Sequence, residues 1–107
     1  MRIIGGTLKG KAIEPPQGYK ARPTTDFAKE NLFNVLNSYI DWEAEPMALD
    51  LFAGTGSITL ELLSRGCSRV VCIEKDPLHF RFIKDFIDRY NEGYDVVYGV
   101  RGDRTTD

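Results

Sequence analysis

The chain has few of the residues that build metal sites or disulfide frameworks. Its 107 residues include two cysteines, Cys67 and Cys72, and a single histidine, His79. A structural zinc site normally takes four cysteine or histidine ligands, and a disulfide-rich domain needs more cysteines than two. We therefore predict no metal ion, and we interpret the two cysteines as reduced thiols in or near a hydrophobic core.

Long hydrophobic runs are also absent. No stretch approaches the roughly 18 apolar residues of a membrane span, and the segment that starts at Met1 has no apolar stretch long enough for a signal peptide. These absences predict a cytoplasmic protein. The hydrophobic fraction of 42% and the charged fraction of 28% are typical of a folded globular protein, and 107 residues allow one domain with a modest core.

Acidic side chains are scarce at the start of the chain. Residues 1–25 contain one of them, Glu14, although the net charge of the whole chain is −2. Five basic side chains occur in the same segment: Arg2, Lys9, Lys11, Lys20 and Arg22. A basic segment joined to an acidic remainder suits a polyanionic partner, but a solvated hairpin with lysines on its open face has the same composition. Charge alone leaves both interpretations open.

Turn residues and apolar periodicity divide the chain into a short arm and an alternating series of strands and helices. Short apolar stretches separated by glycines predict a basic N-terminal β-hairpin within residues 1–23. The remainder, residues 24–107, reads as helix, strand, helix, strand, helix, strand. We expect the first helix, capped by Thr24 or Thr25, to pack through its apolar side chains, and the short apolar strands to be covered on both faces. The expected strands lie at residues 47–52, 69–74 and 95–100, and the apolar residues of the first helix are Leu32, Phe33, Val35, Leu36, Tyr39 and Ile40.

The strand and helix order predicts the fold class. Strand, helix, strand, helix, strand is a βαβαβ unit, which is one mononucleotide-binding half of a doubly wound, Rossmann-like sheet. The prediction is therefore an α/β protein in which the N-terminal hairpin extends the first half of such a sheet.

The most specific motif follows the first strand of this unit. Asp50-Leu51-Phe52-Ala53-Gly54-Thr55-Gly56 joins a strand end to a helix start through two glycines, which permit a tight turn and close approach of a ligand to the backbone. A dinucleotide fingerprint, G-x-G-x-x-G, would have a third glycine where this chain has Thr59. The carboxylate of Asp50 opposes a pyrophosphate and suits a cationic, amine-bearing ligand. S-adenosylmethionine is such a ligand.

Glu74 ends the next predicted strand, twenty residues after Gly54. A carboxylate at that place accepts hydrogen bonds from the two ribose hydroxyls of a nucleoside, whether the cofactor is a dinucleotide or S-adenosylmethionine. The alternative is that Asp50 and Glu74 are strand-end carboxylates that only cap loops. Their positions at the ends of adjacent strands around a glycine turn favour the nucleoside interpretation.

Several motifs, in order along residues 1 to about 98, closely resemble the bacterial 16S ribosomal RNA guanine-N2 methyltransferases of the RsmD type. These are class I methyltransferases that use S-adenosylmethionine. The matching motifs are Arg2-Ile3-Ile4-Gly5-Gly6, Lys9-Gly10-Lys11, Pro16-Gln17-Gly18, Arg22-Pro23-Thr24-Thr25-Asp26, Leu32-Phe33-Asn34, the glycine turn, Leu63-Ser64-Arg65-Gly66 and Glu74-Lys75-Asp76.

The resemblance implies methylation of the exocyclic N2 of a guanine in small-subunit ribosomal RNA, either free or in the assembling small subunit. It implies that S-adenosylmethionine is bound by Arg22, Thr24, Asp50, Phe52, Gly54, Gly56 and Glu74. Arg22 is a candidate for the carboxylate of the cofactor, with an RNA contact as the alternative. The RNA backbone would be contacted by Arg2, Lys9, Lys11 and Lys20.

The catalytic motif of that family, Asn/Asp-Pro-Pro-Tyr/Phe, is not in this sequence. The single Pro-Pro pair, Pro15-Pro16, precedes the first core strand and is followed by Gln17, so no catalytic residue is predicted. We therefore expect the cofactor-binding half of such an enzyme, inactive alone. A non-catalytic nucleoside- or RNA-binding module that self-associates through its open sheet is the alternative, and a nicotinamide-dependent oxidoreductase is a third, supported only by the shared βαβ geometry. In the polar tail, Asp103 is the candidate for an adenine contact, against an unstructured terminus.

Overall fold

Three parallel strands form the sheet of this chain. In the computed structural model they are β1 (Met47–Asp50), β2 (Arg69–Ile73) and β3 (Asp95–Gly99), in the order β1-β2-β3. The strands pair in register, with Leu49 beside Val71. The structure describes residues 1–15, 24–51, 54, 56–74, 76–90 and 95–99.

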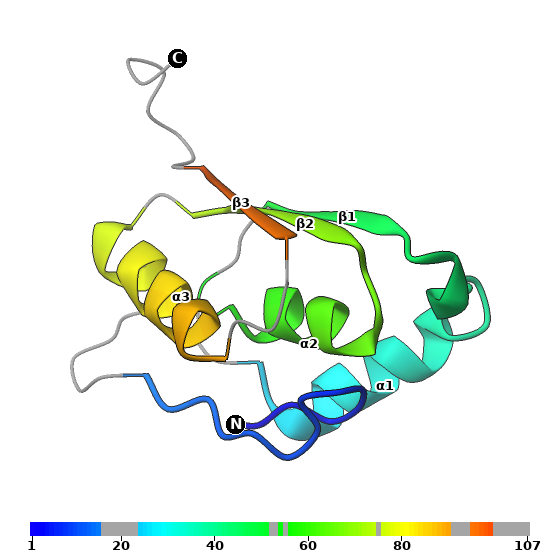
Figure 1. The fold of residues 1–107 in the computed structure, drawn as a ribbon. Coiled ribbons are helices and arrows are strands. Elements are labelled where there is room, and N and C mark those ends of the chain that lie inside the picture. Colours follow the sequence, from blue (N-terminus) through cyan, green and yellow to red (C-terminus); the bar gives the residue numbers. More distant parts are fainter. Residues whose placement is uncertain (16–23, 52–53, 55, 75, 91–94, 100–107) are drawn as a thin grey trace.

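Three α-helices lie together below one face of this sheet (Figure 1). They are α1 (Asp26–Leu36), α2 (Ser57–Arg65) and α3 (Pro77–Arg89), and a short 3-10 helix, η1 (Trp42–Ala44), precedes β1. Because α2 joins β1 to β2 and α3 joins β2 to β3, the predicted βαβαβ unit is confirmed. None of these helices is long and apolar enough to cross a membrane within the part of the chain that the structure describes.

Local sequence determines where the helices begin. The side chain of Thr25 accepts a hydrogen bond from the N–H of Ala28 at 3.0 Å, so Thr25 rather than Thr24 is the N-cap of α1. Asp76 caps α3 in the same way by accepting from the N–H of Leu78 at 2.9 Å, with Pro77 at the first helical position. The glycine turn leads into α2 without a side-chain cap.

The hydrophobic core fills the space between the helices, the helical face of the sheet and the N-terminal arm, defined here as residues 1–15. Both cysteines are in this core, and both are free thiols, as predicted. Burial raises the pKa of Cys67, and it raises the pKa of Cys72 to about 11. The fully buried apolar side chains include Ile3, Ile13, Phe33, Leu60, Val70 and Ile83.

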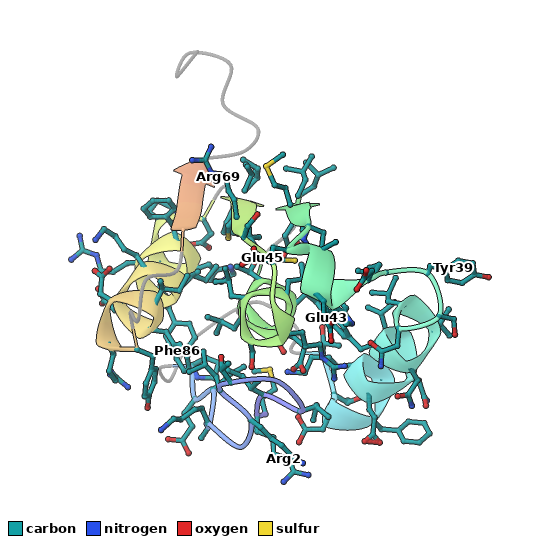
Figure 2. The ribbon with its side chains drawn as sticks, turned by 45° about the vertical axis from the view of Figure 1, so that its right-hand side comes forward. Arg2, Tyr39, Glu43, Glu45, Arg69 and Phe86 are labelled. Carbon is teal, nitrogen blue, oxygen red and sulfur yellow. The ribbon has the colours of Figure 1, made fainter. Side chains whose placement is uncertain are left out.

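The prediction that both faces of the strands are covered is wrong for β1. Met47 is 74% exposed and Leu49 is 59% exposed, because their side chains alternate away from the face that carries the helices. Figure 2 shows side chains standing on this uncovered side, including that of Arg69 in β2. Within the described residues the helices and the sheet therefore form two layers (Figure 1), and the other face of the sheet is open.

The predicted packing face of α1 is also partly wrong. Of its expected contact residues Phe33 is buried, whereas Leu32, Val35 and Tyr39 are exposed (Tyr39 in Figure 2). The buried side of the helix passes through Phe33 and Lys29 instead. A lysine in a core is not visible to apolar periodicity, so the pattern included the exposed Leu32 and Val35 and omitted Lys29, although Leu36 does pack against the core as predicted.

The N-terminal arm forms a hairpin-like loop rather than two regular strands. It has one antiparallel bridge, between Arg2 and Ala12, and the N–H of Ile3 donates to the carbonyl of Lys11 at 3.0 Å. The arm lies against the C-terminal half of α2, where the N–H of Thr7 donates to the carbonyl of Ser64 at 2.8 Å. Figure 1 shows the arm below the helices, on the side away from the sheet.

A buried ion pair joins the arm to two helices. Nζ of Lys29 in α1 lies 3.2 Å from Oε1 of Glu61 in α2, and neither side chain is exposed. Glu61 also accepts the N–H groups of Ile4 and Gly5, each at 2.9 Å, and Nε of Arg65 at 2.8 Å. Burial alone would raise the pKa of Glu61, but these donors hold it below its ordinary value.

Removing the positive partner of this pair should strongly destabilise the fold. We expect Lys29→Met to lower the free energy of unfolding by about 3 kcal/mol, near the lower end for a broken buried ion pair, because Arg65 still contacts Glu61. Urea unfolding followed by circular dichroism measures the change. Lys84→Met, which breaks the exposed Lys84–Asp88 pair, is the control and should leave the unfolding midpoint unchanged. A loss at Lys29 no larger than that of the control would contradict the expectation.

The two core cysteines should resist thiol reagents while the chain is folded. At about pH 8, a thiol with the pKa of Cys72 is ionised in about one molecule in a thousand, and burial adds a steric barrier. We expect slow reaction with an aromatic disulfide reagent in buffer and rapid reaction of both thiols in concentrated urea. Rapid labelling of Cys72 without denaturant would show that the core is not packed as described.

Candidate cofactor site and basic arm

The parallel sheet brings the two predicted acidic residues to one edge. Asp50 is the last residue of β1, and Glu74 directly follows the end of β2. Asp50 pairs with Cys72 in the register of the two strands. Asp50 and Glu74 therefore both lie at the carboxyl ends of neighbouring parallel strands. This is the edge at which open α/β sheets bind ligands.

The carboxylate of Glu74 links the glycine turn to the start of α3 through two hydrogen bonds. Its Oε1 accepts the N–H of Gly54 at 2.9 Å, and its Oε2 accepts the N–H of Asp76 at 3.0 Å. Gly54 has a φ of 55°, in the left-handed region that favours glycine. A carboxylate has about four lone-pair sites, so these two backbone donors leave Glu74 able to accept further hydrogen bonds.

Asp50 is held by the residue that replaces the third glycine of a dinucleotide fingerprint. Oγ1 of Thr59, in the first turn of α2, donates to Oδ2 of Asp50 at 2.7 Å. The pKa of the Cys72 thiol is raised mainly by burial and further by the nearby carboxylates of Asp50 and Glu74, while Thr59 lowers it. Thr59 therefore has a structural role at the place of the third glycine, because its hydroxyl holds the side chain of Asp50 at the strand end.

Gly56 has a packing role that the sequence did not reveal. Its φ is 80°, and a Cβ at this position would lie 2.7 Å from Cγ1 of Ile83 in α3. A side chain there would collide with the core as well as strain the backbone. Gly56 thus permits contact between the start of α2 and α3, in addition to the predicted approach of a ligand to the turn.

The remaining predicted cofactor residues are placed only in part. Thr24 is half-buried and precedes the N-cap of α1. Arg22 and Phe52 lie outside the described residues, as does Lys20 of the predicted RNA-contacting set. Asp103 also lies outside them.

The chemistry of the described residues fits S-adenosylmethionine. Asp50 and Glu74 offer carboxylate oxygens, which accept hydrogen bonds from ribose hydroxyls and attract an ammonium or a sulfonium. The carboxylate of Asp50 would repel a pyrophosphate at the turn, whereas that of Glu74 suits the ribose of either kind of ligand. The arrangement therefore suits a cationic nucleoside better than a dinucleotide.

The basic residues of the arm are exposed but do not form one cluster. Arg2 and Lys9 line a shallow hollow of about 240 Å³ together with Glu30 of α1, and Nε of Arg2 lies 3.6 Å from Asp26. Lys11 points elsewhere, with Nζ 5.1 Å from the centre of the Tyr90 ring. The arm therefore presents its positive charges on two sides.

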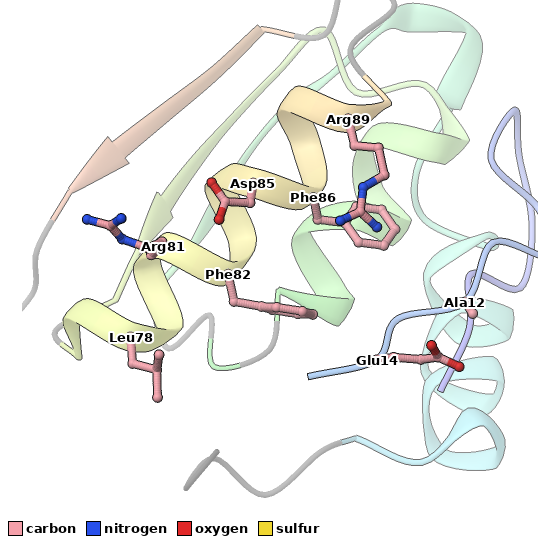
Figure 3. A pocket seen from close by; sticks show the side chains of 8 residues that line it. All are labelled: Ala12, Glu14, Leu78, Arg81, Phe82, Asp85, Phe86 and Arg89. Atoms are coloured by element: carbon pink, nitrogen blue, oxygen red, sulfur yellow. The ribbon is translucent and has the colours of Figure 1, made fainter. Parts of the chain in front are cut away.

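A larger hollow, of about 370 Å³, lies between the arm and α3 (Figure 3). Ala12 and Glu14 of the arm form one wall, and the side chains of α3 form the other. Two arginines and two carboxylates line it, so its charges cancel and favour no polyanion. Its lining residues are Ala12, Glu14, Leu78, Arg81, Phe82, Asp85, Phe86 and Arg89.

Sequence reasoning missed three polar residues that shape this region. Lys29 and Glu61 form the buried pair, and Nζ of Lys29 also donates to Oγ of Ser57 at 2.8 Å, directly after Gly56. His79 is buried in the first turn of α3 beside Glu74. His79 is the single histidine of the chain, but nothing in the sequence linked it to Glu74.

Comparison with known proteins gives relatives over most of the chain. Residues 1–105 match the family described as "Conserved hypothetical protein 95". Ribosomal RNA small subunit methyltransferase D of Escherichia coli (strain K12) is 42% identical over 76 residues, which cover 71% of this chain and 37% of that protein. The protein of the same name from Buchnera aphidicola subsp. Acyrthosiphon pisum is 34% identical over 103 residues, which cover 96% of this chain and 50% of that protein.

Solved structures have the same fold. The methyltransferase candidate yhhF from Escherichia coli superposes with a TM-score of 0.78 at 29% identity, over 99% of this chain and 54% of that one. A hypothetical protein of Thermus thermophilus gives a TM-score of 0.77 at 34% identity, over 94% and 56% of the two chains. The chain thus spans about half of these structures and 37–50% of the two sequence relatives. The Rossmann-like prediction is confirmed, and the chain belongs to the family of the bacterial ribosomal RNA small subunit methyltransferases D.

Proposed function

We propose that this chain is the methyl-donor-binding half of an S-adenosylmethionine-dependent methyltransferase that modifies the exocyclic N2 of a guanine in small-subunit ribosomal RNA. The observation that carries the proposal is the pair of fixed carboxylates, Asp50 and Glu74, at the ends of adjacent parallel strands on either side of a glycine turn. Membership in a family of ribosomal RNA methyltransferases supplies the reaction class.

Each carboxylate has a distinct task in this proposal. Glu74 accepts the ribose hydroxyls while its two backbone donors hold its orientation. Asp50, held by Thr59, faces the positively charged part of the ligand. S-adenosylmethionine, when bound, supplies an electrophilic methyl group on its sulfonium. Thr24, Arg22, Phe52, Gly54 and Gly56 complete the proposed binding set.

The arm provides the proposed RNA contact. Arg2, Lys9 and Lys11 are exposed, and Lys20 belongs to the same basic segment. Phosphate contacts of this kind position RNA without reading its sequence. We therefore assign residues 1–23 to RNA attachment and residues 24–107 to the methyl donor, and we place the residues that select and orient the guanine outside these 107 residues, which contain no Asn/Asp-Pro-Pro-Tyr/Phe tetrapeptide.

Binding of the methyl donor should depend on both carboxylates. We expect Asp50→Asn and Glu74→Gln each to weaken S-adenosylmethionine binding by about tenfold or more, because each removes a charge-assisted contact. Isothermal titration calorimetry measures the affinities, and circular dichroism checks that the variants fold. Lys84→Met is the control and should bind normally. Tighter binding of NAD than of S-adenosylmethionine would refute the cofactor assignment.

RNA binding should depend on the arm through charge alone. We expect Lys9→Ala with Lys11→Ala to weaken binding to a small-subunit ribosomal RNA fragment and to reduce the slope of log affinity against log salt by about 1.5, the value for two lost phosphate contacts. Affinity for S-adenosylmethionine should not change.

The matched control removes the same charge from distant positions. Arg69 lies at the uncovered side of the sheet, far from Arg2 of the arm (Figure 2), and Lys84 is exposed on α3. The pair Arg69→Ala with Lys84→Ala should leave the salt slope near that of the unaltered chain. Equal slopes for the two double variants, measured by fluorescence anisotropy, would show that the arm is not the RNA contact.

A further inference from the structure

A histidine buried behind Glu74 has no part in the site as described so far. We propose that His79 is a positioning residue for Glu74, whose carboxylate it holds in the plane needed to accept both ribose hydroxyls of an adenosine-containing ligand. The proposal rests on the proposed function, because that function assigns Glu74 to the ribose.

Both ring nitrogens of His79 face carboxylate oxygens. Nδ1 lies 3.3 Å from Oε2 of Glu74, and Nε2 lies 3.7 Å from Oδ2 of Asp76. The same Oε2 of Glu74 accepts the backbone N–H of Asp76, while Oε1 accepts that of Gly54. The imidazole therefore lies against a carboxylate whose two oxygens each already accept a backbone N–H.

His79 is nearly buried beside the carboxylate that it contacts. Its side chain is 8% exposed, against 12% for Glu74 and 37% for Asp76. Both side chains are nearly buried, and the contact of the ring is with Oε2 of Glu74, so we assign the ligand to the carboxylate and the support of that carboxylate to the ring. These groups are also not arranged to bind a metal ion, and neither is any other cluster of three such residues in the described ranges.

His79 lies in the first turn of α3, after the N-cap Asp76 and the first helical residue Pro77. Asp76 already caps the helix by accepting the N–H of Leu78, so His79 is not needed to begin it. Its ring lies instead between two carboxylates, 3.3 Å from Glu74 and 3.7 Å from Asp76.

Ribose recognition needs this kind of support. Two neighbouring hydroxyls donate to one carboxylate only when its plane is fixed relative to the sugar, and fixing it before binding avoids an entropic cost at the moment of binding. A hydrogen-bonded partner behind a ligating group commonly supplies that orientation. His79 is in that place for Glu74.

The test compares two ligands that differ only in the ribose hydroxyls. Calorimetry gives the affinities of S-adenosylhomocysteine and of its 2′,3′-dideoxy counterpart for the unaltered chain, His79→Leu and His79→Asn. We expect the unaltered chain to prefer the hydroxylated ligand, and His79→Leu to reduce that preference about tenfold. His79→Asn, whose amide N–H can occupy the place of Nδ1–H, should restore most of it.

The outcomes separate this proposal from the one on which it rests. If His79→Leu keeps the full preference, or weakens both ligands equally, the positioning role is refuted while the ribose role of Glu74 stands. If the unaltered chain binds neither ligand, or binds both equally, the ribose assignment fails and the inference fails with it.

A spectroscopic measurement keeps the proposal testable if His79→Leu does not fold. His79 is the single histidine of the chain, so labelling histidine with ¹⁵N gives the signals of this ring alone. We expect the Nδ1 signal of the unaltered chain to shift on addition of S-adenosylhomocysteine and to stay in place with the dideoxy ligand. Identical responses to the two ligands would overturn the proposal.

Discussion

The buried contact between Lys29 and Glu61 is the interaction on which the rest of this structure depends. Burying two charges is costly, and it is tolerated only where the remaining hydrogen-bonding capacity is satisfied. Here Glu61 also accepts from Arg65 and from two backbone N–H groups of the arm, and Lys29 also donates to the carbonyl of Arg2 and to Ser57. One polar cluster thus holds the arm, α1 and α2 together, and through Ser57 it reaches the residue next to Gly56.

The parts of the fold that the sequence predicted are those with a local signal. Asp76-Pro77 and Gly66 determine where helices begin and end, and the order of the strands places Asp50 and Glu74 at one sheet edge, because parallel strands share that edge. The Lys29–Glu61 cluster has no such signal. Its members come from three separate segments, each an ordinary charged residue on a helix or a backbone group in the arm, and their burial follows only from how those segments pack.

The exposed apolar residues show a second limit of local patterns. The apolar run of β1 indicates a strand that needs cover on both faces, yet Met47 and Leu49 are exposed. Apolar periodicity shows which side chains favour burial. It does not show whether another element of the described chain packs against them. The same is true of Leu32 and Val35 on α1, where the apolar pattern was genuine but the buried side of the helix was the one that carries Phe33 and the lysine.

Asp50 and Glu74 make the contacts expected of loop-capping carboxylates, and these contacts are compatible with the cofactor role that we propose for them. Glu74 caps the glycine turn and the start of α3 by accepting two backbone N–H groups, and Asp50 accepts the hydroxyl of Thr59. A carboxylate that already accepts two hydrogen bonds is oriented and still has unused lone pairs. In the function that we propose, these contacts prepare both groups for binding, since a ligand that meets fixed carboxylates does not have to order them.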